Sequence, residues 1–436
     1  MKLTYGVADK PNFGKVLVFA LQQLLAILAA TIAVPAIIGN GMSTSAALFG
    51  AGVGTLVYLL FTKFKSPVFL GSSFAFIGSM FAAFGGAASA AAGYAGIILG
   101  AFFAGLVYVI LAIVISAVGV NWVNKLMPAV VIGPTVAIIG LSLAGNAVGD
   151  VLGSSNDTST AVCVICGLVT LFVTMICSVF GKRMLKMIPF IVGICAGYIV
   201  AAIFTLIGNS TGNDALKVIN FAAFENMKWI PDFTFMTAIK GLSDITPAYI
   251  GTVAAAYVPV AFVVFAEHIA DHKNLSSIIE SDLLEEPGLH RTLLGDGVGS
   301  MVGAFFGGCP NTTYGESVGC VAISGNASVV TILTTAIIAI IASFFAPFVT
   351  ILATIPSCVM GGVCVALYGF IAVSGLKMIQ KVDLDDNANL FTVSVILIAG
   401  IGGFAVSFGS VTITEVACAL ILGIITNKVL GLKKKK

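Results

Sequence analysis

Two glutamates lie in stretches of the chain that are otherwise apolar or uncharged. Glu267 is part of Phe265-Ala-Glu-His-Ile269, and Glu316 ends Pro310-Asn-Thr-Thr-Tyr-Gly-Glu316. If these stretches cross a bilayer, inserting each carboxylate costs several kcal/mol, so an ionisable residue there indicates a function. Carboxylates accept hydrogen bonds from the N–H groups of a ligand, and they can also carry a proton.

A third carboxylate, Asp271, follows Glu267 by four residues. On a helix this spacing places the two side chains on one face, about 6 Å apart, while His268 is turned roughly 100° aside. Two stacked carboxylates in an apolar site do not both ionise, so the pair is a candidate proton carrier. In the alternative interpretation, 271–273 is the solvated end of the helix, and Glu267, one turn deeper, is the remaining candidate.

The segments 66–74 and 309–316 are poor helix formers. Each combines proline, glycine and serine or threonine residues, which favour extended or turn conformations. Non-helical backbone at membrane depth is tolerated where it lines a cavity or is buried in protein. The half-helix that follows then begins with free N–H groups and a positive dipole end, which for 309–316 falls beside Glu316.

Together these groups fit a small planar ligand that has both N–H donors and C=O acceptors. The carboxylates would accept from its N–H groups, and the backbone amides would donate to its carbonyls. A pyrimidine such as uracil presents such an edge.

The elements that position these residues are long apolar helices. Of the 436 residues, 59% are hydrophobic and 9% are charged, against roughly 25% charged residues in soluble domains. Apolar runs close to the roughly 20 residues that cross a bilayer recur along the chain. Runs such as 97–116 and 329–347 lack the alternation of a transmembrane barrel. The chain is therefore predicted to be an all-α polytopic membrane protein.

Polar and glycine- or proline-rich gaps divide the chain into about fourteen segments. Three of them, 292–307, 310–324 and 390–406, are shorter than a full crossing, which is typical of broken helices that line a transport site. The predicted segments are approximately 16–38, 45–62, 67–84, 94–118, 128–147, 160–180, 188–208, 248–271, 292–307, 310–324, 328–346, 356–376, 390–406 and 411–430.

Fourteen spans would place both termini on one side of the membrane. That side would hold all of the 21 basic residues except Lys217, Lys228 and Lys240, and its terminal run Lys433–Lys436 would contact anionic lipid headgroups. Basic residues collect on the cytoplasmic side of membrane proteins. We therefore expect a protein of the cell (inner) membrane with both termini in the cytoplasm.

The chain also contains an internal repeat. Met127-Pro-Ala-Val-Val-Ile-Gly-Pro134 resembles Ile355-Pro-Ser-Cys-Val-Met-Gly-Gly362, and Ser66-Pro-Val-Phe-Leu-Gly-Ser-Ser-Phe74 resembles Cys309-Pro-Asn-Thr-Thr-Tyr-Gly-Glu316. Repeats of seven spans, an odd number, enter the membrane in opposite directions, which is the inverted-repeat plan of secondary transporters. The predicted fold is therefore two inverted seven-span repeats, with short extended stretches in spans 3 and 10.

Several motifs, in the same order, resemble the nucleobase–ascorbate transporter family, and within it the bacterial members that carry uracil. The resemblance covers nearly the whole chain and implies proton-coupled uracil import by alternating access in a homodimer. It also implies a core domain formed by 1–118 and 248–346, and a gate domain formed by 119–247 and 347–436. Its most specific motifs are Ala30-Thr-Ile-Ala-Val-Pro35, Leu70-Gly-Ser-Ser-Phe-Ala-Phe76, Phe265-Ala-Glu-His-Ile269, Glu286-Pro-Gly-Leu-His-Arg291 and Pro310-Asn-Thr-Thr-Tyr-Gly-Glu316.

The resemblance also implies roles for individual residues. The glutamates that match Glu267 and Glu316 hydrogen-bond the pyrimidine in such transporters. Two departures concern the proton: a histidine expected at 271 is Asp271 here, and one expected in the first span is Gln23. Coupling through Glu267 and Asp271 is then the expectation. The remaining implied contacts are the backbone amides of Phe74 and Gly315 and the pocket walls Ala30, Tyr314 and Tyr368.

Other functions fit the sequence less well. The closest alternative is a transporter of another nucleobase, such as xanthine, uric acid or a different pyrimidine, whereas an anion carrier would not place two glutamates in its site. An ion channel needs repeated filter residues or a continuous polar pore, and an enzyme needs a nucleophile with its base or a set of metal ligands. The sequence contains neither pattern, so no catalysis, metal or cofactor is expected. A net charge of +2 also argues against a nucleic-acid partner.

Overall fold

Long apolar helices dominate the computed structural model, which describes residues 3–119, 122, 125, 128–153, 158–182, 184–225, 227–408 and 411–431. Within them, eight helices are long and apolar enough to cross a membrane, and a ninth span is formed if the bent pair α15 (Val329–Ser343) and α16 (Ala346–Ala353) counts as one. The eight are α1 (Phe13–Ile38), α2 (Thr44–Phe61), α4 (Ala90–Val118), α6 with α7 (Ala129–Ser142 and Ala144–Val151), α8 (Thr160–Phe180), α10 (Pro189–Thr211), α12 (Pro247–Ile279) and α17 (Ser357–Ile379).

Large apolar side chains cover the outside of these helices. Phe102 and Ile113 on α4 and Ile199 and Ile203 on α10 are all exposed. An aqueous protein rarely exposes apolar surface on this scale, whereas lipid tails accept it. Helices also satisfy their own backbone hydrogen bonds, which the bilayer core requires. The chain is an integral membrane protein, as the sequence predicts.

Shorter or less apolar elements fill the other predicted segments. Two predicted spans consist of a short strand followed by a short helix, so the predicted count of fourteen goes beyond the eight or nine described helices that are both long and apolar enough to cross. These other elements are β1 (Leu70–Ser72), η1 (Phe74–Phe76), α3 (Ile77–Gly85), α13 (Leu289–Gly307), β2 (Asn311–Thr313), α14 (Gly315–Ser324), α18 (Asn387–Ile401) and α19 (Glu415–Gly431).

Strands β1 and β2 pair antiparallel in the middle of the protein. Leu70 lies opposite Thr313, and Ser72 opposite Asn311. All the residues of both strands are buried, and the pairing satisfies backbone groups that would otherwise be unpaired in a water-poor interior. The prediction of extended stretches at these two places is confirmed.

The place where β1 and β2 pair is called the strand crossing below, and it requires glycine at position 71. A Cβ atom at this position would overlap the ring of Tyr314, which packs across the strand. Any larger residue would therefore have to displace that ring or separate the two strands.

A second strand pair was not predicted. Strand β3 (Val406–Phe408) pairs antiparallel with β4 (Val411–Ile413), with Val406 opposite Ile413. Helix α18 stops at Ile401, before Gly402 and Gly403, and Gly403 has a left-handed φ of 69°. The prediction of helix at 411–413 is wrong, because β-branched residues there join a strand and helix α19 begins only at Glu415.

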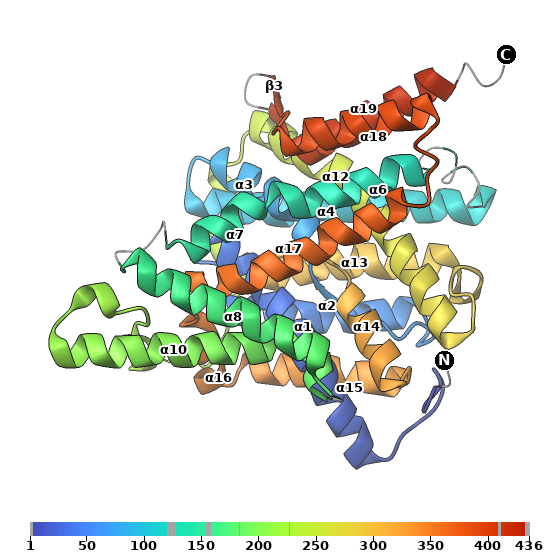
Figure 1. Cartoon of the computed structure of the whole chain (residues 1–436). Helices are drawn as coiled ribbons and strands as arrows, with labels where there is room; N and C mark the ends of the chain where they lie inside the picture. Colours follow the sequence, from blue (N-terminus) through green and yellow to red (C-terminus); the bar gives the residue numbers. More distant parts are fainter. Residues whose placement is uncertain are drawn as a thin grey trace.

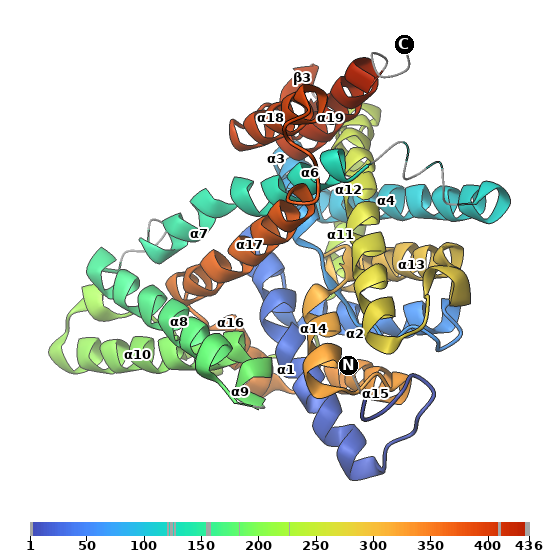
Figure 2. The same cartoon turned by 45° about the vertical axis from the view of Figure 1, so that its right-hand side comes forward.

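The helices form two packed groups (Figures 1 and 2). In one group, α13 packs against α2 and α4, and α15 packs against α1 and α2. In the other, α17 packs against α6, α7 and α8, α8 packs against α10, and α18 packs against α19 and α6. The close approach of α2 and α13 depends on glycines, since a Cβ at Gly50 would overlap the carbonyl of Gly303.

Connecting segments complete the chain. Some predicted features, namely Lys433–Lys436, Arg183, Lys2 and Met127 of the repeat, lie outside the described residues. The connecting elements are α9 (Met184–Met187), η2 (Asp214–Leu216), η3 (Phe221–Phe224), α11 (Thr234–Ala238), η4 (Ile239–Asp244) and η5 (Leu284–Gly288).

Candidate functional site

The strand crossing sets the start of helix α14 at the centre of the molecule. Tyr314 caps this helix in an extended conformation, and Gly315 and Glu316 form its first turn. The first N–H groups of a helix have no partner within it and carry partial positive charge. The end of β2 therefore places a carboxylate and free amide donors next to each other.

Glu316 and Glu267 line the same cavity, which has a volume of about 350 Å³. Asp271 and Gly315 line it as well, so the predicted arrangement of Glu267 and Asp271 on one face of α12 is present. Four of the residues predicted for the site thus come together from two separate elements. Other lining residues include Ala26 of α1, Gly319 and Cys320 of α14, and Leu367, Phe370, Ile371 and Ser374 of α17.

Asp271 is tied to the strand crossing by a hydrogen bond. The Thr313 hydroxyl donates to its Oδ2 atom at 2.9 Å. Helix α12 continues to Ile279, two turns further, and the next residue, His272, is fully buried. The alternative interpretation places the solvated end of the helix at 271–273, whereas helix α12 ends only at Ile279 and runs past the cavity.

Asp271 also faces a second, wider cavity. This vestibule has a volume of about 1160 Å³ and is lined by Lys273, Lys377 and Lys381. It shares Ala270, Asp271, Ser374 and Met378 with the smaller cavity. Asp271 thus stands in the wall between a space lined by carboxylates and a space lined by lysines.

Gln23 has a position next to Glu316 that the sequence did not reveal. Its side-chain amide donates to the Ser317 carbonyl at 3.3 Å and also contacts the Ser317 hydroxyl. That hydroxyl accepts from the Phe69 N–H at 3.1 Å. Gln23 therefore joins α1, the start of α14 and the residue before β1, which fixes the backbone on which Glu316 sits.

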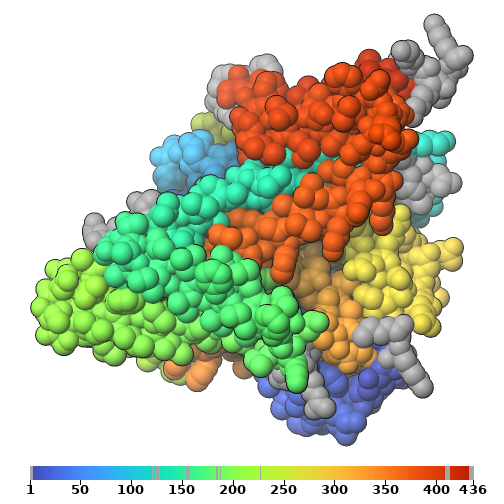
Figure 3. Space-filling model, viewed as in Figure 1, coloured from blue at the N-terminus to red at the C-terminus, as the bar shows by residue number. Residues whose placement is uncertain are grey.

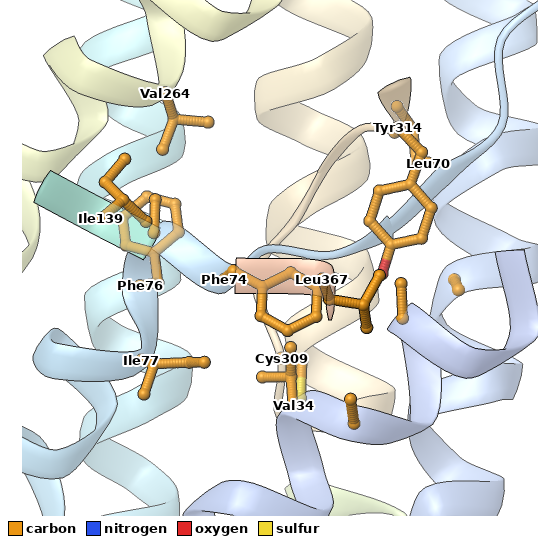
Figure 4. Close-up of a cluster of buried hydrophobic side chains, with 14 of the residues drawn as sticks. Val34, Leu70, Phe74, Phe76, Ile77, Ile139, Val264, Cys309, Tyr314 and Leu367 are labelled. Atoms are coloured by element: carbon orange, nitrogen blue, oxygen red, sulfur yellow. The ribbon is translucent and has the colours of Figure 1, made fainter. Parts of the chain in front are cut away.

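Four of the predicted site residues lie outside the cavity. Among its described lining residues, Ala30, Phe74, Tyr314 and Tyr368 are not found. They are buried around the strand crossing instead, where the rings of Phe74 and Tyr368 meet edge to face at 5.8 Å and the Tyr314 hydroxyl donates to the Ser72 carbonyl at 2.9 Å. Figure 4 shows Phe74 and Tyr314 packed among apolar side chains such as Leu367.

A buried polar network lies behind the strand crossing. His268 Nδ1 lies 2.7 Å from Asp296 Oδ2, its Nε2 lies 3.0 Å from the Thr292 hydroxyl, and the Thr312 hydroxyl donates to Asp296 at 3.4 Å. Asp296 and His268 are both fully buried. Asp296 is not among the predicted site residues, although an acidic residue within the short apolar segment 292–307 is a signal for such a role.

The network continues along α12. The carbonyl of His268 lies 2.8 Å from His272 Nδ1, and His272 Nε2 lies 2.7 Å from the Tyr58 hydroxyl, which also donates to Ser66. Strand β2 is thereby held from both sides, because Thr312 reaches this network while Thr313 reaches Asp271. Buried polar groups of this kind are stable only when they are paired.

These features are those of a class of protein: a membrane transporter with a central cavity at short, interrupted helices. Solved structures share the fold, including the transmembrane domain of the cyanobacterial bicarbonate transporter BicA, with a TM-score of 0.66 and 16% identity over 97% of this chain and 99% of that one. At such low identity the likeness concerns the fold alone.

The chain belongs to the family described as the permease family (Xan_ur_permease), whose model matches residues 14–408, and this is the nucleobase–ascorbate transporter family that the motifs resemble. The uracil permease of Bacillus subtilis (strain 168) is 38% identical over 446 residues, covering 100% of this chain and 97% of that one. The uracil permease of Bacillus caldolyticus is 40% identical over 427 residues, covering 97% and 94%.

Proposed function

We propose that this protein imports uracil together with protons across the cell membrane. One observation carries the proposal: Glu267 and Glu316, from separate elements, line one cavity together with Gly315, at the N-terminal end of α14. The names of the relatives support the choice of uracil, since both Bacillus proteins are uracil permeases.

In this proposal the two glutamates accept hydrogen bonds from the ring N–H groups of uracil. The amide of Gly315 donates to one carbonyl of the base, where the positive end of α14 favours the partial negative charge. A Cβ atom at Gly315 would lie 3.7 Å from Asp271 Oδ1. The backbone at Gly315 is thus close enough for one small ligand to meet both the amide and the carboxylates.

Ala30, Phe74, Tyr314 and Tyr368 have a different place in the proposal. They form the closed wall that separates the cavity from the far side of the protein, where another cavity of about 760 Å³ is lined by Pro35, Asp150, Lys228 and others. Phe74 from one helix group meets Tyr368 from the other at this wall. Movement of the two groups against each other would open it, and the amide of Phe74 would then reach the second carbonyl of the base.

Glu267 and Asp271 are the proposed proton carriers. Asp271 borders both the cavity and the lysine-lined vestibule, so a proton accepted beside the substrate can leave towards the vestibule. Positive charge there disfavours a return of the proton. We place the vestibule on the cytoplasmic side, because basic residues gather on that side.

The topology proposed is fourteen spans in two inverted repeats, in a homodimer of the cell (inner) membrane with cytoplasmic termini. The two helix groups support a division into a core domain (1–118 and 248–346) and a gate domain (119–247 and 347–436), because most helix packing lies within these groups. The crossing of β1 and β2, each followed by a short helix, supports a repeat relationship between them.

The function is tested by uptake of labelled uracil into cells that lack their own uracil transporters. We expect concentrative uptake that collapses when the proton gradient and membrane potential are removed. Uptake that persists after this collapse and follows a sodium gradient would contradict proton coupling. One methyl group changes binding by only about 1–3 kcal/mol, so the residues of the site do not by themselves distinguish uracil from thymine. Competition of uracil uptake by xanthine, uric acid, thymine and other bases identifies the preferred ligand.

A further inference from the structure

Lys186 lines the substrate cavity together with the three carboxylates. The charged side chains among the described lining residues are Glu267, Asp271, Glu316 and this one lysine. Lys186 belongs to the short helix α9, and its side chain is exposed. Among its described lining residues, the cavity therefore has three acidic groups and a single cation, on an exposed side chain.

The lysine and the carboxylates belong to different helix groups. Helix α9 is packed against α8 and α10, which belong to the same group as α17. Glu267 is on α12, which packs against α4, and Glu316 is on α14, which packs against α1, so both belong to the other group. Helix α9 also touches α14 and α1 (Figure 2). On the face shown in Figure 3, the green residues that include α8 lie near the orange residues that include α14. Relative movement of the groups would therefore change the distance from Lys186 to the carboxylates.

In the proposed transport cycle, the negative charge of the cavity carboxylates is neutralised differently in the loaded and in the empty carrier. When the carrier is loaded, a proton neutralises one carboxylate and the N–H groups of the base satisfy the others. When the carrier returns empty and deprotonated, the same carboxylates must be enclosed without either partner. Enclosed carboxylates without a counter-charge are strongly disfavoured, so the empty carrier needs a cation from its own chain.

We propose that Lys186 is this counter-ion: it closes over the carboxylates of the empty, deprotonated carrier and so permits its return across the membrane. Its flexible stem and compact ammonium group suit a contact that forms and breaks in every cycle. The proposal rests on the proposed function, because it needs a carrier that cycles between loaded and empty states. It predicts that Lys186 matters for the return step and not for movement of the loaded carrier.

Two assays on purified protein in liposomes separate these steps. Exchange of labelled for unlabelled uracil uses only the loaded carrier, whereas net uptake requires its empty return. With Lys186→Gln we expect net uptake to fall at least tenfold while exchange stays within twofold of the unsubstituted protein. Lys186→Arg keeps the charge and should retain net uptake. Lys182→Gln is the matched control, since Lys182 is exposed just before α9 and does not line the cavity.

The outcomes distinguish a counter-ion role of Lys186 in the empty carrier from no role in transport and from an equal role in both steps. Net uptake that is unchanged in Lys186→Gln overturns the proposal, and so does an equal loss of exchange and net uptake. If Lys186→Gln is not recovered as folded protein, Lys186→Met, which has an uncharged and unbranched side chain, is tested by the same comparison of net uptake with exchange. If the unsubstituted protein itself does not exchange uracil, the proposed function fails, and the result is distinct from failure of the counter-ion role.

Discussion

Thr313 on strand β2 donates a 2.9 Å hydrogen bond to the carboxylate of Asp271 on helix α12. This contact links the strand crossing, where β1 and β2 pair, to the helix that carries Glu267. Its neighbour on the strand, Thr312, faces the other way, towards Asp296. The alternation of side chains along a strand thus connects the cavity on one face with the buried network on the other.

Substitution Asp271→Asn separates binding from coupling. The amide oxygen still accepts from Thr313, but the group no longer titrates. With one pH unit across the membrane and no potential, coupling to one proton sustains about a tenfold uracil gradient. We expect Asp271→Asn to bind uracil with nearly unchanged affinity and to reach a gradient close to one. Normal accumulation would leave Glu267 as the proton carrier of α12.

Substitution Gln23→Leu tests the support of Glu316. It removes the hydrogen bonds to Ser317, each worth about 1 kcal/mol, and so should weaken uracil binding about fivefold without abolishing it. Ser317→Ala keeps the carbonyl acceptor but removes the hydroxyl that binds both Gln23 and the Phe69 N–H, so it should weaken binding by a similar amount. The two changes together should be less than additive, because they remove one shared contact. Unaltered affinity in Gln23→Leu, measured by calorimetry, would rule out this supporting role.

The pair of His268 and Asp296 is predicted to stabilise the fold. Asp296→Ala leaves the buried imidazole without its partner at 2.7 Å and should lower the free energy of unfolding by about 1–3 kcal/mol. Asp296→Asn keeps one acceptor oxygen and should lose less. Thermal melting in detergent measures both, with the exposed Asp385→Ala as control. Melting of Asp296→Ala at the temperature of the unsubstituted protein would show that the pair is not stabilising.

Gly71→Ala should disrupt the strand crossing. The added methyl group overlaps the Tyr314 ring, so the yield of folded protein and its uracil affinity should both fall. Gly369→Ala on α17 is the matched control, because a Cβ there meets no atom within 4 Å. Size-exclusion chromatography of the two variants provides the comparison. Equal yield and equal affinity would mean that the crossing adapts to the methyl group.

The sequence predicted the parts of the site that depend on local chemistry. Carboxylates in apolar stretches, and proline with small hydroxylated residues at 66–74 and 309–316, each carry a strong local signal. The structure places Glu267, Asp271, Gly315 and Glu316 around one cavity and forms a three-residue strand within each segment. That the two strands pair with each other is a finding of the structure and was not predicted from their similar composition.

Contacts between distant elements could not be predicted in the same way. Gln23 was noticed only as a departure from a family pattern, although it binds Ser317 across the helix interface. Asp296 was overlooked because its partner His268 lies on another helix. The β3–β4 hairpin was missed because a short apolar run of β-branched residues reads equally as helix or strand.

The measurement that tests the central claim most directly is uracil binding to purified Glu267→Gln and Glu316→Gln. Each change removes a charge-assisted hydrogen bond worth about 1.5–3 kcal/mol, so the Kd should rise about tenfold to a hundredfold. Glu285→Gln, an exposed glutamate outside the cavity, is the control and should bind as the unsubstituted protein does. Calorimetry that finds uracil bound with unchanged affinity by both cavity variants would contradict the account, because the base would then be held without the carboxylates.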